Sequence, residues 1–146
     1  LRDYGLKFVP LMVKETYVYV WKKHPLADRS ELSLSELTEY PCVSFDQNSD
    51  NEFYLSEEAL GDYDFDKLIK SSDRATSAEL MTSLNGYSIG TGNITDSQAL
   101  KKGIIAIKLK EEDPLTIGYI VKKNHKLSDI AEKYIQELLK YRELNE

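Results

Sequence analysis

Short runs of β-branched and aromatic residues recur along the chain and predict β-strands, because these residues suit the pleated surface of a sheet. The runs cover residues 6–11, 16–21, 41–45, 67–72, 87–92, 104–109 and 116–121. Residues 16–21 are apolar or aromatic on both faces, which is typical of a strand that is covered on both sides. Pro25 then ends this strand, since proline has no N–H for the ladder and disfavours helix at His24.

Segments with apolar residues three and four positions apart separate most of these runs and predict helices. The segments cover residues 33–37, 51–60, 76–84, 95–102 and 128–139. Ser33 and Glu36 have the spacing of a capping box, and Thr76 or Ser77 is placed to cap the helix that follows it. The alternation of strands and helices predicts parallel βαβ units, and hence an open α/β sheet.

The composition is that of a globular protein, with 41% apolar and 30% charged residues among 146. The net charge of −6 argues against a nucleic-acid-binding surface, which needs clustered cations. No apolar run approaches the ~20 residues that cross a bilayer. The single cysteine, Cys42, excludes an internal disulfide and suits a reducing compartment, which predicts a cytoplasmic location. Because the chain begins with Leu1 and not Met, we expect it to belong to a longer protein.

No catalytic or cofactor motif stands out, so the sequence does not predict an enzyme, and no cofactor is expected. His24 and His125 lie in predicted turns, where we expect surface or turn roles and not general-base roles. With one cysteine, with His24 and His125 far apart in the sequence and with no clustered ligand motif, we expect no metal site. Cys42 lies in a β-branched run and is expected to be a small buried hydrophobe. Residues 90–92 (Gly-Thr-Gly) lack the further glycines and the lysine of a phosphate-binding loop, which favours a tight turn.

Polar side chains follow two of the predicted strands at points where helices are expected to begin. The residues in these turns that could contact a ligand are Asp46, Gln47, Asn48 and Ser49 after the first strand and Thr76 and Ser77 after the second. Unpaired backbone N–H groups at a helix start, with hydroxyl or amide side chains beside them, can bind a small anion or an amino acid. In an open α/β sheet such turns line a crevice at the carboxyl ends of the strands. The alternative is that Ser49, Thr76 and Ser77 only cap their own helices.

Several segments, in order, resemble the effector-binding domain of LysR-type transcriptional regulators. They are residues 6–11, 24–27 (His-Pro-Leu-Ala), 32–37, 41–45, 84–90 and 127–138. Tyr87 and Ser88 stand where the family usually has a second glycine, and Ile135 stands at a phenylalanine position. The resemblance implies an α/β fold of the periplasmic-binding-protein type with two lobes. Residues 27–112 would form the second lobe, and residues 1–26 and 113–146 would be the remnant of an incomplete first lobe.

The same resemblance implies a function in effector sensing. A small metabolite would bind in the cleft between the lobes and control transcription, and its contacts would include Asp46, Gln47, Asn48, Thr76 and Ser77, with Ile89 or Thr91 near the cleft floor. DNA would be bound only through a helix-turn-helix upstream of this chain, and no membrane would be involved. Apolar faces that the first lobe normally covers would be exposed, which predicts either self-association as a homodimer or tetramer or a compact second lobe with loosely held ends. The alternatives are a solute-binding protein of a transport system, which shares the two-lobed fold, and a small enzyme.

Overall fold

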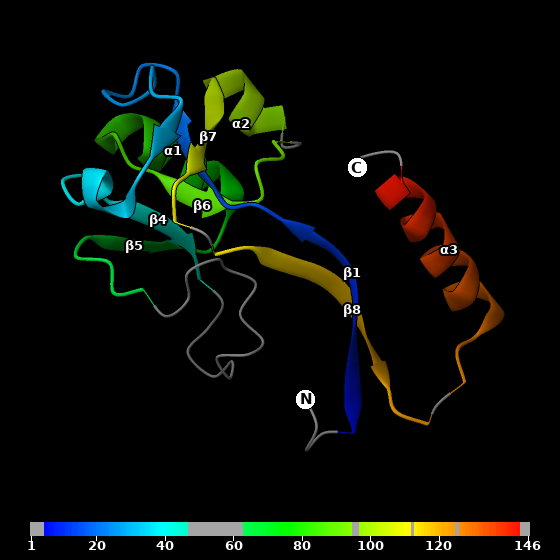
Figure 1. The fold of residues 1–146 in the computed structure, drawn as a ribbon. Coiled ribbons are helices and arrows are strands. Elements are labelled where there is room, and N and C mark those ends of the chain that lie inside the picture. Colours follow the sequence, from blue (N-terminus) through cyan, green and yellow to red (C-terminus); the bar gives the residue numbers. More distant parts are fainter. Residues whose placement is uncertain (1–4, 47–62, 95–96, 112, 125, 144–146) are drawn as a thin grey trace. The chain divides into compact units, whose positions relative to one another are not determined.

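The chain forms two compact units, and each has its own secondary structure. The computed structural model describes residues 5–46, 63–94, 97–111, 113–124 and 126–143. Unit 1 consists of Leu1–Lys14 and Thr116–Glu146, and unit 2 consists of Glu15–Leu115 (Figure 1). The sequence placed the first division after residue 26, whereas the contacts place it between Lys14 and Glu15. The difference arises because residues 17–21 pair with strands of unit 2.

In its described residues, unit 1 is a two-stranded sheet accompanied by the helix α3. Its elements are β1 (Leu6–Lys14), β8 (Leu115–Lys122) and α3 (Asp129–Glu143). Lys123 N donates to Gly5 O at 2.8 Å, which places the end of β8 beside the start of β1, so the strands run antiparallel. β1 is longer than the predicted strand and continues through Pro10, since a strand in a two-stranded sheet has a free edge that tolerates proline. Ala131 N donates to Ser128 Oγ at 3.3 Å, so α3 begins where the sequence predicts.

The strands of unit 2 are all connected to one another through backbone hydrogen bonds. The strands are β2 (Tyr17–Trp21), β3 (Glu31–Leu32), β4 (Cys42–Phe45), β5 (Leu68–Ser71), β6 (Ser88–Gly90) and β7 (Ile104–Leu109). Four of them form a sheet in the order β3-β7-β2-β6, and β4 pairs with β5. Val43 N donates to Tyr87 O at 2.7 Å and Tyr87 N donates to Pro41 O at 3.0 Å. These two bonds join β4 to the residue that precedes β6, and so link the pair to the four-stranded sheet.

The sheet of unit 2 is mixed, which corrects the expectation of parallel strands throughout. β2 runs antiparallel to both of its neighbours, β6 and β7, whereas β3 is parallel to β7 and β4 is parallel to β5. The bridge between Cys42 and Tyr87 is also parallel. Every described strand of unit 2 apart from β2 therefore runs in the same direction. The order of elements along the chain does not reveal this, because β2 pairs with strands that come some 70 residues or more later.

The core lies on both faces of this sheet. Side chains along β2 alternate between the two faces and so contribute to two separate buried clusters. Val18 and Val20 are fully buried and pack with Leu32, Leu37 and Ile107 on one face. On the other face, Tyr19 and Trp21 pack against a second buried cluster. That cluster consists of Val43, Met81 and Ile104. The prediction that residues 16–21 form a strand covered on both sides is therefore confirmed.

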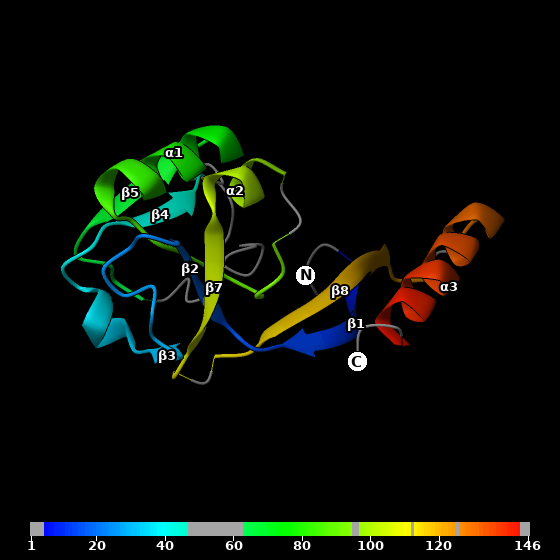
Figure 2. The same cartoon turned by 90° about the horizontal axis from the view of Figure 1, so that it is seen from above.

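The described residues of unit 2 include three short helical segments beside the strands. They are the 3₁₀ helix η2 (Leu34–Leu37), α1 (Arg74–Leu84) and α2 (Ser97–Lys102). α1 and α2 lie side by side, as both views show (Figure 2). The expected helix at 51–60 lies outside the described residues, as do residues 95 and 96 of the helix expected at 95–102. β3 was not predicted, because two residues carry too little of a pattern to be recognised.

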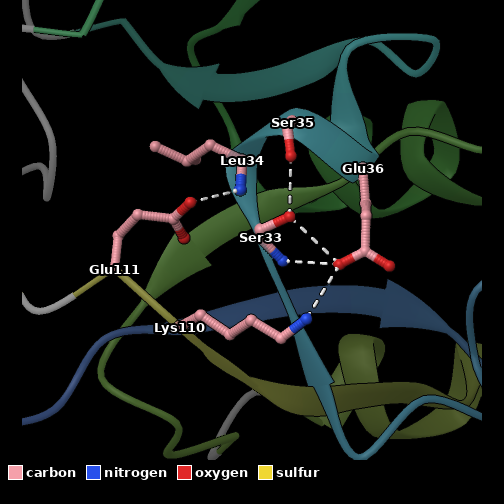
Figure 3. Close-up of polar contacts among 6 residues, drawn as sticks. All are labelled: Ser33, Leu34, Ser35, Glu36, Lys110 and Glu111. Atoms are coloured by element: carbon pink, nitrogen blue, oxygen red, sulfur yellow. Dashed lines mark hydrogen bonds and ion pairs between the residues drawn. The ribbon is translucent and has the colours of Figure 1, made fainter.

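Carboxylates hold the start of η2. Ser33 N donates to Glu36 Oε2 at 3.0 Å, which is the bond that the predicted capping box requires of its glutamate. Leu34 N donates to Glu111 Oε1 at 2.9 Å, and Lys110 Nζ lies 3.3 Å from Glu36 Oε2 (Figure 3). The helix predicted at residues 33–37 is a 3₁₀ helix over Leu34–Leu37 and not an α-helix, since a segment this short has no room for a second α-helical turn.

Candidate functional site

The parallel strands of unit 2 bring the predicted polar turns to one edge of the sheet. In the register of β4 and β5, Phe45 lies opposite Ser71, and Asp46 N donates to Ser71 O at 2.9 Å. Since β6 runs in the same direction, its carboxyl end also points to this edge. We call this edge the carboxyl edge; it includes Asp46, the start of α1 and Thr91. Asp46 and Thr91 are half-buried.

Asp73, and not Thr76 or Ser77, caps α1. Asp73 has an extended backbone, with φ −143° and ψ 151°, and its Oδ1 accepts a hydrogen bond from Thr76 N at 2.8 Å. Ser77 Oγ donates to Asp73 O at 2.9 Å, and Ser71 Oγ donates to the same oxygen at 3.0 Å. The sequence-based capping assignment was wrong by one turn, because an aspartate three residues upstream supplies a carboxylate to the first turn.

This cap changes what the start of α1 can offer a ligand. The hydrogen bonds from Thr76 hold the pKa of the Asp73 carboxyl below its usual value, so Asp73 is ionised at neutral pH. Its carboxylate already occupies the Thr76 amide. The exposed Thr76 side chain and the exposed Arg74 side chain lie beside it in the first turn of the helix. The helix start therefore presents a carboxylate, a hydroxyl and a guanidinium, in place of bare N–H groups.

Two tyrosines explain the glycines that flank Thr91. A Cβ added at Gly90 would lie 2.6 Å from Cε2 of Tyr19, and one added at Gly92 would lie 2.8 Å from Cδ2 of Tyr17. Gly92 also has a φ of +84°, which L side chains rarely adopt. The glycines thus allow tyrosine rings to pack on the turn, as the interpretation of residues 90–92 as a tight turn predicts.

An ion pair that sequence reasoning missed lies at the same edge. Tyr17 is opposite both Gly90 and Lys108, so the start of β2 and the end of β7 reach the carboxyl edge. Lys108 Nζ lies 2.7 Å from Glu15 Oε1. The hydrogen bond from Lys108 lowers the pKa of the Glu15 carboxyl, and Glu15 in turn raises the pKa of Lys108. These residues are distant in sequence, and only the strand pairing brings them together.

Of the other predicted ligand contacts, Gln47, Asn48 and Ser49 lie outside the described residues. Ile89 is half-buried and packs against the main core cluster. The structure therefore brings Asp46, Thr76, Ser77 and Thr91 to one edge of the sheet.

His24 and Cys42 belong to the core and not to this edge. His24 is 3% exposed; its Nδ1 accepts a hydrogen bond from Leu26 N at 3.0 Å, and its Nε2 lies 2.9 Å from Asn85 O. With Nδ1 as an acceptor, the proton of the neutral ring is on Nε2, which donates to Asn85. Burial lowers the pKa of His24. The expected turn role is confirmed, but the surface position is not. Cys42 is 3% exposed, as expected of a small buried hydrophobe.

The described residues of the chain have neither a cluster of metal-binding side chains nor a helix suited to crossing a membrane. Those residues contain no group of three or more His, Cys, Asp or Glu side chains that could hold a metal ion. None of the helices described is both long and apolar enough to cross a membrane.

Comparison with known proteins identifies the family. Residues 1–143 match the LysR substrate binding domain. The chain belongs to this family. That membership confirms the resemblance drawn from the sequence, and it identifies an effector-binding domain of LysR-type regulators and not an enzyme. No curated protein sequence matches the chain.

Solved structures of LysR regulators share the fold. HinK, a LysR family transcriptional regulator from Pseudomonas aeruginosa, has a TM-score of 0.72 at 15% identity, over 96% of this chain and 49% of HinK. The effector-binding domain of QuiR, in complex with shikimate, has a TM-score of 0.68 at 21% identity, over 97% of this chain and 67% of that domain. The regulatory domain of CcmR from Synechocystis PCC6803, in complex with 2-PG, has a TM-score of 0.64 at 14% identity, over 94% and 67% of the two chains. The LysR domain described here thus spans about half the length of HinK, and the predicted α/β class is confirmed.

Proposed function

We propose that this LysR domain senses a small polar metabolite at the carboxyl edge of unit 2, as part of a cytoplasmic DNA-binding transcription regulator. The observation that supports the proposal is the convergence of Asp46, the α1 start and Thr91 at the ends of parallel strands. Ligands of open α/β sheets bind outside the carboxyl ends of the strands. The relatives solved with shikimate and with 2-PG support a small-molecule effector.

The charges at this edge restrict the class of effector. Asp46 and Asp73 are acceptors, Arg74 is a cation, and Thr76, Ser77 and Thr91 have hydroxyl groups. Because Asp73 occupies an N–H group of the first turn, a bare dianion would meet a carboxylate there. A metabolite with hydroxyl or amino groups, with at most one carboxylate to pair with Arg74, fits this set of side chains best.

The proposal also includes the division into lobes. Unit 2 would be the second lobe of the effector domain, and unit 1 would belong to the first lobe. DNA would be bound by a part of the longer protein outside this chain. Unit 1 exposes several large apolar side chains, and we propose that they take part in self-association as a dimer or tetramer. They are Phe8, Val13, Ile117, Ile120, Ile130 and Tyr134.

Thermal-shift screening of the chain tests the effector proposal. The panel would contain hydroxy acids, amino acids and dicarboxylates, and a hit would be measured by calorimetric titration. Thr76→Val and Thr91→Val each remove one hydroxyl, and we expect binding about tenfold weaker, since a lost hydrogen bond is worth about 1–1.5 kcal/mol. Thr116→Val, at an exposed position in unit 1, is the matched control. No hit in the panel, or equal binding by all variants, would contradict the proposal.

A further inference from the structure

A small cavity lies at the opposite edge of the sheet of unit 2. Tyr40, Lys67 and Tyr87 stand at or just before the amino ends of β4, β5 and β6, whereas the proposed effector site lies beyond the carboxyl ends. The cavity volume is about 10 Å³, which is room for one water-sized group. The lining residues are Leu34, Thr38, Tyr40, Tyr63, Phe65, Asp66, Lys67 and Tyr87.

Aromatic rings provide much of the wall. The rings of Tyr63 and Phe65 have centroids 4.7 Å apart and are inclined by 60°, and those of Phe65 and Tyr87 are 6.4 Å apart and inclined by 61°. Both ring pairs are tilted and not stacked, and all three residues line the cavity. We call Tyr40, Tyr63, Phe65 and Tyr87 the aromatic cup. Tyr87 is buried, whereas Tyr63 is 39% exposed, so the cup is accessible from the Tyr63 side.

The electrostatics of the aromatic cup favour a cation. Asp66 is the carboxylate among the lining residues. Burial, and then the neighbouring Cys42, Tyr63 and Asp66 groups, raise the pKa of the Tyr87 hydroxyl. The cationic end of Lys67 is engaged elsewhere. Its Nζ donates to Glu39 O at 2.9 Å and lies 3.8 Å from Glu39 Oε2. The lining therefore combines aromatic rings with the Asp66 carboxylate, and its own lysine is paired with a residue outside the lining.

We propose that the aromatic cup binds the ammonium head of a small primary amine in place of one water. An ammonium group is close to water in size, and so it matches the cavity. Aromatic faces attract cations, more strongly where water is excluded, and Asp66 adds a charge of opposite sign. Thr38 and the tyrosine hydroxyls can accept its N–H groups. This site is independent of the proposed effector site, because the two lie at opposite ends of the same strands.

Titration of the whole chain with methylammonium chloride tests the proposal. The readout is the NMR signals of the Tyr and Phe rings in ¹³C-labelled protein, with sodium chloride at equal ionic strength as the reference. We expect saturable shifts of the Tyr63, Phe65 and Tyr87 rings with a Kd below about 100 mM. Tetramethylammonium is larger than the cavity and should bind at least fivefold more weakly.

Substitutions identify the groups responsible. Asp66→Asn removes the charge and Tyr63→Leu removes the most exposed ring; each should weaken methylammonium binding by about 5- to 30-fold. Asp64→Asn is the matched control, because Asp64 is an exposed carboxylate that does not line the cavity. Ring shifts that are linear, that sodium chloride reproduces, or that persist unchanged in both variants would overturn the proposal. The effector screen with Thr76→Val reports on the other edge, so either proposal can fail alone.

Discussion

Replacing His24 tests whether a buried neutral histidine joins the turn after β2 to the end of α1. The ring accepts from Leu26 N and donates to Asn85 O, and it packs 4.5 Å from the Tyr40 ring. His24→Asn places an oxygen near the Nδ1 position and keeps the first bond, but its side chain is too short for the second. Since one lost hydrogen bond to a buried partner costs about 1–2 kcal/mol, we expect that loss in the free energy of unfolding. His24→Ala removes both bonds and the ring contacts, and should cost about 3–4 kcal/mol.

The pH dependence gives a sharper test, because only the wild type has this titrating group. A proton on Nδ1 would replace an acceptor by a donor that faces the Leu26 N–H, and burial already lowers the pKa of His24 in the folded state. The unfolded chain then binds a proton that the folded chain does not. The stabilisation is complete above the unfolded pKa of about 6.5 and is lost as the pH falls below it. The loss is at most about 1.4 kcal/mol per pH unit.

Urea unfolding at pH 7.5 and pH 5.5 measures this effect. Trp21 is the single tryptophan, and its Nε1 donates to Asn85 Oδ1 at 2.9 Å, so its fluorescence reports on the same junction. Carboxylates titrate equally in the wild type and in His24→Asn and cancel in the difference. The stability advantage of the wild type over His24→Asn should shrink by about 1 kcal/mol at the lower pH. A difference that is independent of pH, or a His24→Ala variant as stable as the wild type, would refute the reasoning.

Three further predictions concern other contacts of unit 2. Glu111→Ala leaves the buried Leu34 N–H without its acceptor and should cost about 1–2 kcal/mol in urea unfolding. Glu111→Gln keeps that acceptor and should change the free energy of unfolding by less than about 1 kcal/mol. The change is small because Oε2 of Glu111 is buried without a partner, so little is lost with its charge. Gly90→Ala should cost about 1–3 kcal/mol, because its Cβ would displace the Tyr19 ring, and an unchanged melting temperature would argue against that contact. Asp73→Ala should destabilise α1, because it removes the carboxylate that accepts from Thr76 N. Since the pKa of Asp73 is lowered in the folded state, the stabilisation by this cap should be present above the ordinary aspartate pKa and disappear as the pH falls through the folded value. Circular-dichroism melts from pH 7 to pH 2 measure this effect, and no difference between Asp73→Ala and the wild type at any pH would contradict it.

Local patterns in the sequence were sufficient for much of the secondary structure and for the family. The apolar run at residues 16–21 predicted a doubly covered strand, and the spacing of Ser33 and Glu36 predicted the bond that holds the start of η2. Both features depend on residues within a few positions of one another, so the chain itself specifies them. The same is true of the ordered segments that indicated the LysR family.

Contacts between distant residues decided the rest. The direction of β2 follows from its pairing with β6 and β7, and the ion pair of Glu15 with Lys108 follows from that register. His24 is buried because Asn85, 61 positions later, provides a partner for its Nε2. The aromatic cup likewise joins Tyr40 to Tyr87 across the edge of the sheet. Local propensities determine which segments are strands or helices. Which strands pair with one another depends on burying apolar faces from distant segments together, and no short segment of the sequence encodes that choice.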